Sequence, residues 1–142
     1  MPWRLILLVS SLFICEAQAS LKLTPTQDWQ LVVHGHVKQT FHLTEYSKKN
    51  RSKYYFVQFI RGQRPIAERL IPQARWLRWQ QALSQTLGTL STQKNCREVL
   101  SWGKTQSSIQ LPGLCLDEAS TQQIGRLNQT LNEMTDYLRA PL

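Results

Sequence analysis

Apolar and polar residues alternate along positions 28–46, the pattern of a β-strand that buries one face and leaves the other in water. The odd positions are mostly apolar, and the even positions are mostly polar and include every histidine of the chain. Such a stretch is longer than an ordinary strand. We therefore expect two strand segments, 30–34 and 37–44, with Gly35 at a bend, a bulge or a tight reversal between them.

The stretch 53–71 predicts a β-hairpin. Residues 53–60 are rich in aromatic and β-branched side chains and are apolar on both faces, which is typical of an internal strand. The sequence RGQRP at 61–65 supplies turn residues, and 66–71 returns as the second strand. This hairpin is the expected centre of the sheet.

Two helices are predicted, at 73–87 and at about 118–139. Pro72 suits the first turn of the first helix and Gly88 suits its C-terminal end. Asp117 is the expected N-cap of the second helix. Apolar residues recur every three or four positions and should face the sheet. These stripes are Trp76, Trp79 or Gln80, Leu83 and Leu87 in the first helix, and Ile124, Leu127, Leu131, Met134 and Leu138 in the second.

The first 19 residues have the features of a secretory signal peptide: Arg4, an apolar run from Leu5 to Cys15, and small residues at Ala17 and Ala19. The run is too short to span a bilayer comfortably, and no second long run follows. Cleavage before residue 20 leaves one domain, 20–142, that is secreted or periplasmic and has no transmembrane segment. The alternative is a lipoprotein anchored at Cys15, which the bulky residue before that cysteine disfavours.

Residues 96–102 and 107–111 predict a further hairpin across 103–106. Cys96 and Cys115 lie near its open end, and two cysteines in an exported chain predict a structural disulfide. Together the elements define an α+β fold: a small antiparallel sheet of two or three hairpins, packed by two helices and closed by one disulfide.

The net charge is concentrated in the middle of the chain. Nine basic residues and one acidic residue lie between Lys48 and Arg78, a net charge of +8 that equals that of the whole chain. This concentration predicts a basic face that engages an anionic envelope polymer or an acidic partner protein. The alternative is a merely solubilising surface. The residues of the predicted face are Lys48, Lys49, Arg51, Lys53, Arg61, Arg64, Arg75 and Arg78.

Tryptophan alternates with arginine at 75–79, as on nucleic-acid-binding surfaces, but a small domain needs its tryptophans in the core. Nucleic acid is therefore not the expected partner. The chain carries no nucleophile elbow, P-loop, dinucleotide fingerprint or H-E-x-x-H motif, and its size and charge favour a binding protein over an enzyme.

His34, His36 and His42 fall on the polar face of the first alternating stretch. Imidazoles on one face of a strand are good ligands for Zn²⁺ or Cu²⁺, so a metal-binding protein or metal-dependent enzyme is the alternative function. His42 is too far along a straight strand to join the other two unless the chain reverses near Gly35. Solvated histidines on a sheet are the favoured interpretation, and no cofactor is expected.

Overall fold

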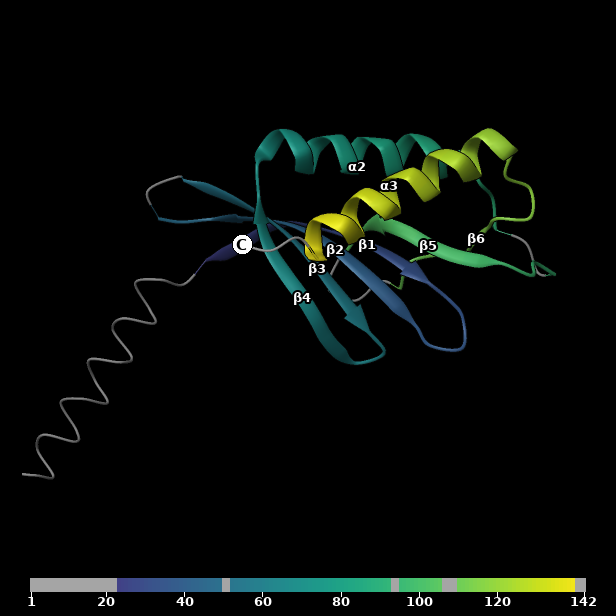
Figure 1. Ribbon diagram of the computed structural model, residues 1–142, viewed down its shortest axis with the longest axis horizontal. Helices are drawn as coiled ribbons and strands as arrows, with labels where there is room; N and C mark the ends of the chain where they lie inside the picture. The colour runs from purple at the N-terminus through teal and green to yellow at the C-terminus, as the bar shows by residue number, and fades with distance from the viewer. Residues whose placement is uncertain (1–22, 50–51, 93–94, 106–109, 140–142) are drawn as a thin grey trace, which may run out of the picture.

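The computed structural model describes residues 23–49, 52–92, 95–105 and 110–139 (Figure 1). The predicted signal peptide, including Cys15, and the predicted binding residue Arg51 lie outside these ranges. None of the described helices combines the length and the apolar character that crossing a membrane requires.

A single antiparallel sheet of six strands organises the described residues, in the order β4-β3-β2-β1-β5-β6. The α+β class is therefore confirmed, with a larger sheet than the sequence predicted. The strands are β1 (Thr24–Val33), β2 (Gln39–Ser47), β3 (Lys53–Arg61), β4 (Arg64–Ile71), β5 (Val99–Lys104) and β6 (Leu114–Cys115).

The first four strands form two consecutive hairpins that pair side by side. The chain reverses around Gly35, as the alternating pattern allowed, and Leu31 lies opposite Phe41 across the hairpin. β1 begins at Thr24, earlier than predicted, because a register shift between Pro25 and Gln27 lets polar residues extend the ladder. Strand β3 pairs on both sides, which confirms that it is internal. The expectation that the 53–71 hairpin is the centre of the sheet is wrong, because β4 is an edge strand and β2 and β1 lie in the middle.

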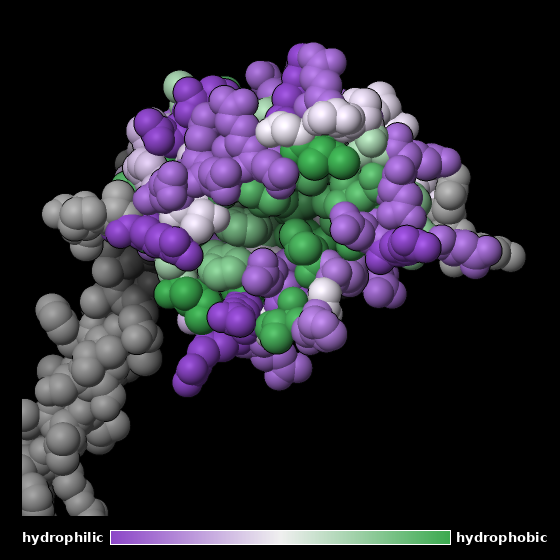
Figure 2. All heavy atoms as spheres, turned by 45° about the vertical axis from the view of Figure 1, so that its right-hand side comes forward, coloured by the Kyte–Doolittle hydropathy of each residue, from purple (hydrophilic) through white to green (hydrophobic). Residues whose placement is uncertain are grey.

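Two helices, α2 (Gln73–Leu87) and α3 (Thr121–Arg139), cover one face of this sheet (Figure 1). Trp76, Trp79, Leu83 and Leu87 of α2 are each at most 1% exposed, so the predicted stripe of this helix faces the sheet. On α3, Leu127 and Met134 are buried while Ile124 stays exposed, so its buried stripe is shorter than predicted. Hydrophobic side chains gather beneath a largely hydrophilic outer helix surface (Figure 2).

The predicted N-cap of the second helix is wrong. Ser120 and Gln123 form a capping box, in which the Ser120 hydroxyl accepts the Gln123 N–H at 3.1 Å and the Gln123 side chain accepts the Ser120 N–H at 2.8 Å. Asp117 instead accepts the backbone N–H groups of Arg97 and Glu98. A carboxylate can cap a helix or accept backbone N–H groups from a loop. Asp117 does the second, because the loop before β5 supplies the donors.

The predicted hairpin of 96–102 with 107–111 is also wrong in its pairing. Residues 107–109 lie outside the described ranges, and Gln110 and Leu111 are not in a strand. Strand β5 pairs with β1 and with the two-residue strand β6. The reason is tertiary packing: Trp102 lies opposite Leu31 and stacks on Trp29, with ring centroids 5.2 Å apart.

Cys96 and Cys115 form the predicted disulfide, with their Cα atoms 5.7 Å apart. The bridge joins the loop before β5 to the end of β6, and Cys115 is 1% exposed. It therefore holds the short edge strand against the sheet.

Replacing both cysteines by serine should lower the free energy of unfolding by about 3 kcal/mol, because the bridge constrains a loop of about 20 residues in the unfolded chain. Urea unfolding of the oxidised protein and of the C96S/C115S variant measures the difference. Equal urea midpoints for the two proteins would contradict this expectation.

Candidate functional site

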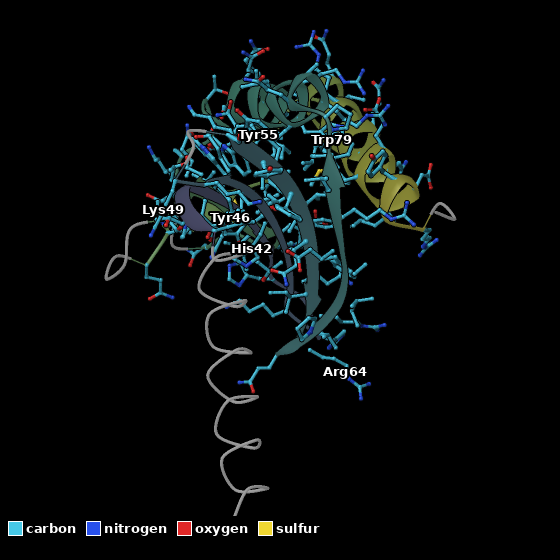
Figure 3. All side chains as sticks on the ribbon, turned by 90° about the vertical axis from the view of Figure 1, so that its left-hand side faces the viewer. His42, Tyr46, Lys49, Tyr55, Arg64 and Trp79 are labelled. Atoms are coloured by element: carbon cyan, nitrogen blue, oxygen red, sulfur yellow. A yellow bond between two sulfur atoms is a disulfide. The ribbon has the colours of Figure 1, made fainter. Side chains whose placement is uncertain are left out.

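The sheet face opposite the helices is hollowed by a cavity of about 1000 Å³, which we call the open-face cavity. Figure 3 shows His42 and Tyr46 on this side of the sheet, whereas Tyr55 and Trp79 lie on the helix side. Strands β1, β2 and β5 line most of it, and Leu111 closes over Gly103, where a Cβ atom would lie 2.9 Å from the leucine Cδ2. The even-numbered polar face predicted for 28–46 is thus the floor of this cavity.

A histidine–aspartate pair lies in the cavity. His42 Nδ1 is 3.1 Å from Asp28 Oδ1 and 3.3 Å from Oδ2. The Thr44 hydroxyl donates to Oδ1 and the Thr105 hydroxyl to Oδ2, each at 3.0 Å. Asp28 of β1 therefore accepts hydrogen bonds from three side chains, two on β2 and one directly after β5.

These contacts keep Asp28 ionised. Burial raises the pKa of its carboxyl, but the hydrogen bond and positive charge of His42 and the hydroxyls of Thr105 and Thr44 outweigh it and leave the pKa below its ordinary value. An ionised carboxylate has no proton to give, so His42 Nδ1 is the donor in this pair. In the neutral imidazole, Nε2 then carries the free lone pair.

Amide side chains flank His42 on both neighbouring strands. The register places Gln30 of β1 and Gln58 of β3 directly opposite His42, and both line the open-face cavity. Directly opposed side chains on one sheet face have Cβ atoms about 4.5–5.5 Å apart. The three side chains therefore form a polar row across the sheet, with hydrogen-bond donors on either side of the imidazole.

The structure separates the three predicted metal ligands. His34 lines the cavity but lies 3.2 Å from the buried Ser101 hydroxyl, and His36 lies in the exposed β1–β2 turn. Within the described ranges, only Cys96, Cys115 and Asp117 bring three potential ligand atoms within 4.8 Å of one another. Two of these atoms are joined in the disulfide and have no thiolate to offer.

The predicted basic residues lie in three places. Lys48, Lys49 and Lys53 surround the β2–β3 connection, and we call them the β2–β3 cluster. The Lys48 ammonium lies 5.5 Å from the centre of the Tyr54 ring, and Lys53 lies 3.8 Å from the Glu45 carboxylate.

Arg61 and Arg64 lie at the opposite end of the sheet, at the β3–β4 turn, as the separation of Lys49 and Arg64 in Figure 3 illustrates. Gly62 of this turn donates its N–H to the Lys38 carbonyl at 2.7 Å, which brings the β1–β2 turn alongside. The turn suits Gly62 because its φ is +64°. We call Lys38, Arg61 and Arg64 the β3–β4 cluster.

The remaining two predicted residues are engaged on the helix layer. Arg78 lies 3.2 Å from the Glu133 carboxylate of α3, which also accepts the Trp79 indole N–H at 3.1 Å. The Arg75 guanidinium lies 4.8 Å from the centre of the Tyr137 ring. These contacts join α2 to α3 on the side of the sheet away from the cavity.

Glu45 is a buried carboxylate on the helix side of the sheet, only 6% exposed. Burial raises its pKa, but hydrogen bonds from Thr26, at 2.7 Å, and from Tyr55, with the charge of Lys53, leave the pKa below the ordinary value. Burial and the same carboxylate raise the pKa of Tyr55. Glu45 thus joins β1, β2 and β3 and faces away from the cavity.

Sequence reasoning missed Asp28, Thr105 and the two glutamines. Asp28 and Gln30 carried a usable signal, because both are even-numbered and share the alternating polar face with His42. No local pattern links Thr105 to Asp28, since 77 positions separate them and only the β1–β5 pairing brings them together.

Compared with known proteins, the chain matches no family model, and no curated protein or solved structure matches it either.

Replacing Asp28 by asparagine should destabilise the protein by about 1–3 kcal/mol at pH 7, because the hydrogen bonds to a charged acceptor weaken. The pKa of Asp28 is lower in the folded protein than in the unfolded chain, where it is about 3.9. The ionised carboxylate therefore stabilises the fold fully above about pH 3.9, and this stabilisation is lost as the pH falls through the folded pKa. Wild type should therefore lose stability more steeply than D28N below about pH 4. Urea unfolding of both proteins from pH 7 to pH 2 tests this, and parallel stability curves would contradict it.

Proposed function

We propose that this protein is an exported binding protein that holds an extended anionic polymer, such as an acidic glycan of a cell envelope, along the open face of its sheet. The observation that carries the proposal is that the open-face cavity extends along β1 and β2 between two basic clusters, one at each end of the strands. A polymer with repeated negative charge can contact both clusters, whereas a small anion can contact only one.

The dimensions support an extended ligand. Strand β2 has nine residues, which corresponds to about 30 Å between the two clusters at the usual rise per residue. A chain lying along this strand would cross the polar row at His42. Amide, hydroxyl and imidazole groups of the cavity are suited to hydrogen bonds with hydroxyl and carboxylate groups of such a ligand.

The charge balance of the cavity also supports an anion. Its described lining contains one acidic residue, Asp28, and two lysines, Lys38 and Lys104. Asp28 already accepts hydrogen bonds from three protein side chains, so its charge is largely compensated within the protein. A negatively charged ligand therefore meets a net positive surface.

Basic residues at the strand ends, and not Arg75 or Arg78, are the ones placed to contact such a ligand. Both arginines lie on the helix layer, where Glu133 and Tyr137 engage them. Lys53 is likewise paired with Glu45 on the helix side. The ligand contacts are therefore assigned to Lys48 and Lys49 of the β2–β3 cluster and to the β3–β4 cluster.

Reversing either cluster should weaken binding of polygalacturonate, a carboxylated glycan used as the probe, by about tenfold or more. The variants K48E/K49E and R61E/R64E each remove two attractive charges and add two repulsive ones. Titration calorimetry at several salt concentrations measures the affinity and the slope of log K against log salt, which should be shallower for each variant.

The matched control is R126E/R139E, which changes the net charge equally on helix α3. It should keep most of the wild-type affinity, because its charges lie on the opposite side of the sheet. Equal losses of affinity in all three variants would mean that only the net charge matters, and would contradict the proposed site. Binding of poly-L-glutamate with no binding of polygalacturonate would contradict a glycan as the ligand and would indicate an acidic protein.

A further inference from the structure

We propose that the open-face cavity also has hydrolytic activity, with His42 as a general base that activates water against a carboxylate ester. The observation is an oriented imidazole between two amide side chains, in a cavity large enough for a ligand. The activity does not depend on the anionic charge of a ligand, so it stands apart from the proposed polymer binding.

The imidazole is held in one orientation. Asp28 accepts the Nδ1 proton, and two threonine hydroxyls hold the carboxylate from both sides, so neither ring flips nor carboxylate rotation is favourable. A buried or half-buried carboxylate that orients a histidine also stabilises the imidazolium formed when Nε2 takes a proton. Asp28 is therefore a positioning residue for His42.

The basic nitrogen is accessible. The His42 side chain is 17% exposed and lines the cavity, and within the described residues no group is hydrogen-bonded to its Nε2. This distinguishes His42 from His34, whose Nε2 lies 3.2 Å from the Ser101 hydroxyl. His42 is thus the histidine of the cavity that a carboxylate orients and whose Nε2 is left to accept a proton from a bound water molecule.

Water is the nucleophile that the surroundings of His42 support. The hydroxyl protons of Thr44 and Thr105 are donated to Asp28, and that of Thr26 is donated to Glu45. These side chains would have to break a hydrogen bond to a carboxylate before attacking a substrate. A water molecule at Nε2 has no such cost.

Stabilisation of the developing oxyanion falls to side chains. The backbone N–H groups of internal strands are used in the sheet ladder, so they cannot form the usual oxyanion hole. The carboxamides of Gln30 and Gln58 lie opposite His42 on either side and can donate N–H groups to an oxygen bound above the row.

The reaction follows from these positions. Water attacks the ester carbonyl carbon while Nε2 takes one of its protons, and the carbonyl electron pair moves onto the oxygen. The tetrahedral intermediate collapses, the bond to the alcohol oxygen breaks, and the imidazolium returns its proton to the leaving group or to solvent. The carboxylic acid so formed loses its remaining proton to solvent, so the products are the carboxylate, the alcohol and one proton, and no other reactant is required.

The experiment measures hydrolysis of p-nitrophenyl acetate by the purified chain at pH 7 to 8. Replacing His42 by glutamine should lower kcat/KM by about 100-fold, the lower end of what a positioned base contributes. The control is His36→Gln, which removes an exposed histidine outside the cavity and should leave the rate unchanged. Equal rates for wild type and H42Q, or equal losses in H42Q and H36Q, would overturn the inference.

Two further measurements test the roles assigned to Asp28 and His42, and each rate is divided by the folded fraction that urea unfolding gives for that variant. D28N should lower kcat by about tenfold or more with little change in KM, because it affects the base and not substrate binding. In wild type, ¹⁵N NMR should show His42 protonated at Nδ1, and hydrolysis should show a normal solvent deuterium isotope effect. An Nε2-protonated ring, or a stoichiometric burst of p-nitrophenolate from direct attack by histidine, would overturn the general-base assignment. Ester cleavage without polygalacturonate binding would keep this inference and contradict only the proposed function.

Discussion

The register of β1 between β2 and β5 is the constraint on which the rest of the structure depends. Leu31, which is 0% exposed, lies opposite Phe41 on one side and Trp102 on the other, so one side chain joins three strands to the core. The same register places Asp28 beside Thr44 and Thr105 on the other face. A slip of one residue would move the apolar set to water and the polar set to the helices, so the core and the cavity are specified together.

The two faces of the sheet have different stability requirements. On the helix side, buried tryptophans and leucines supply apolar burial, at roughly 25 cal/mol per Å² removed from water. Neither of the described helices covers the open face, which carries polar groups that are satisfied by one another, such as His42 with Asp28 and His34 with Ser101. Because strands hold both sets, the polar side chains of the open face have defined positions.

The fold also determines what the basic residues can do. A run of positive charge that is continuous in the sequence is divided by the hairpins between the two ends of the sheet and the outer helix layer. At the strand ends the charges face solvent near the cavity, while Arg78 pairs with Glu133 between helices. Charges of the same type are therefore exposed in one place and engaged in helix packing in another.

The sequence by itself determined the elements whose signal is local. Alternation in 28–46, the apolar strand at 53–60 and the helical stripe ending at Leu87 all have periods that backbone geometry imposes over a few residues. The disulfide followed from the cysteine count and the predicted export of the chain. The polar face that became the cavity floor, including His42, was also visible in this pattern.

Only the tertiary structure decided which segments meet across long separations. The pairing of β5 with β1 replaced the expected local hairpin and brought Thr105 to Asp28 and Ser101 to His34. Ser120, and not Asp117, is the N-cap of α3, because the Asp117 carboxylate accepts backbone N–H groups of the loop before β5. These contacts depend on packing between residues that are distant in the sequence, such as Trp102 and Trp29, so no local sequence pattern predicts them.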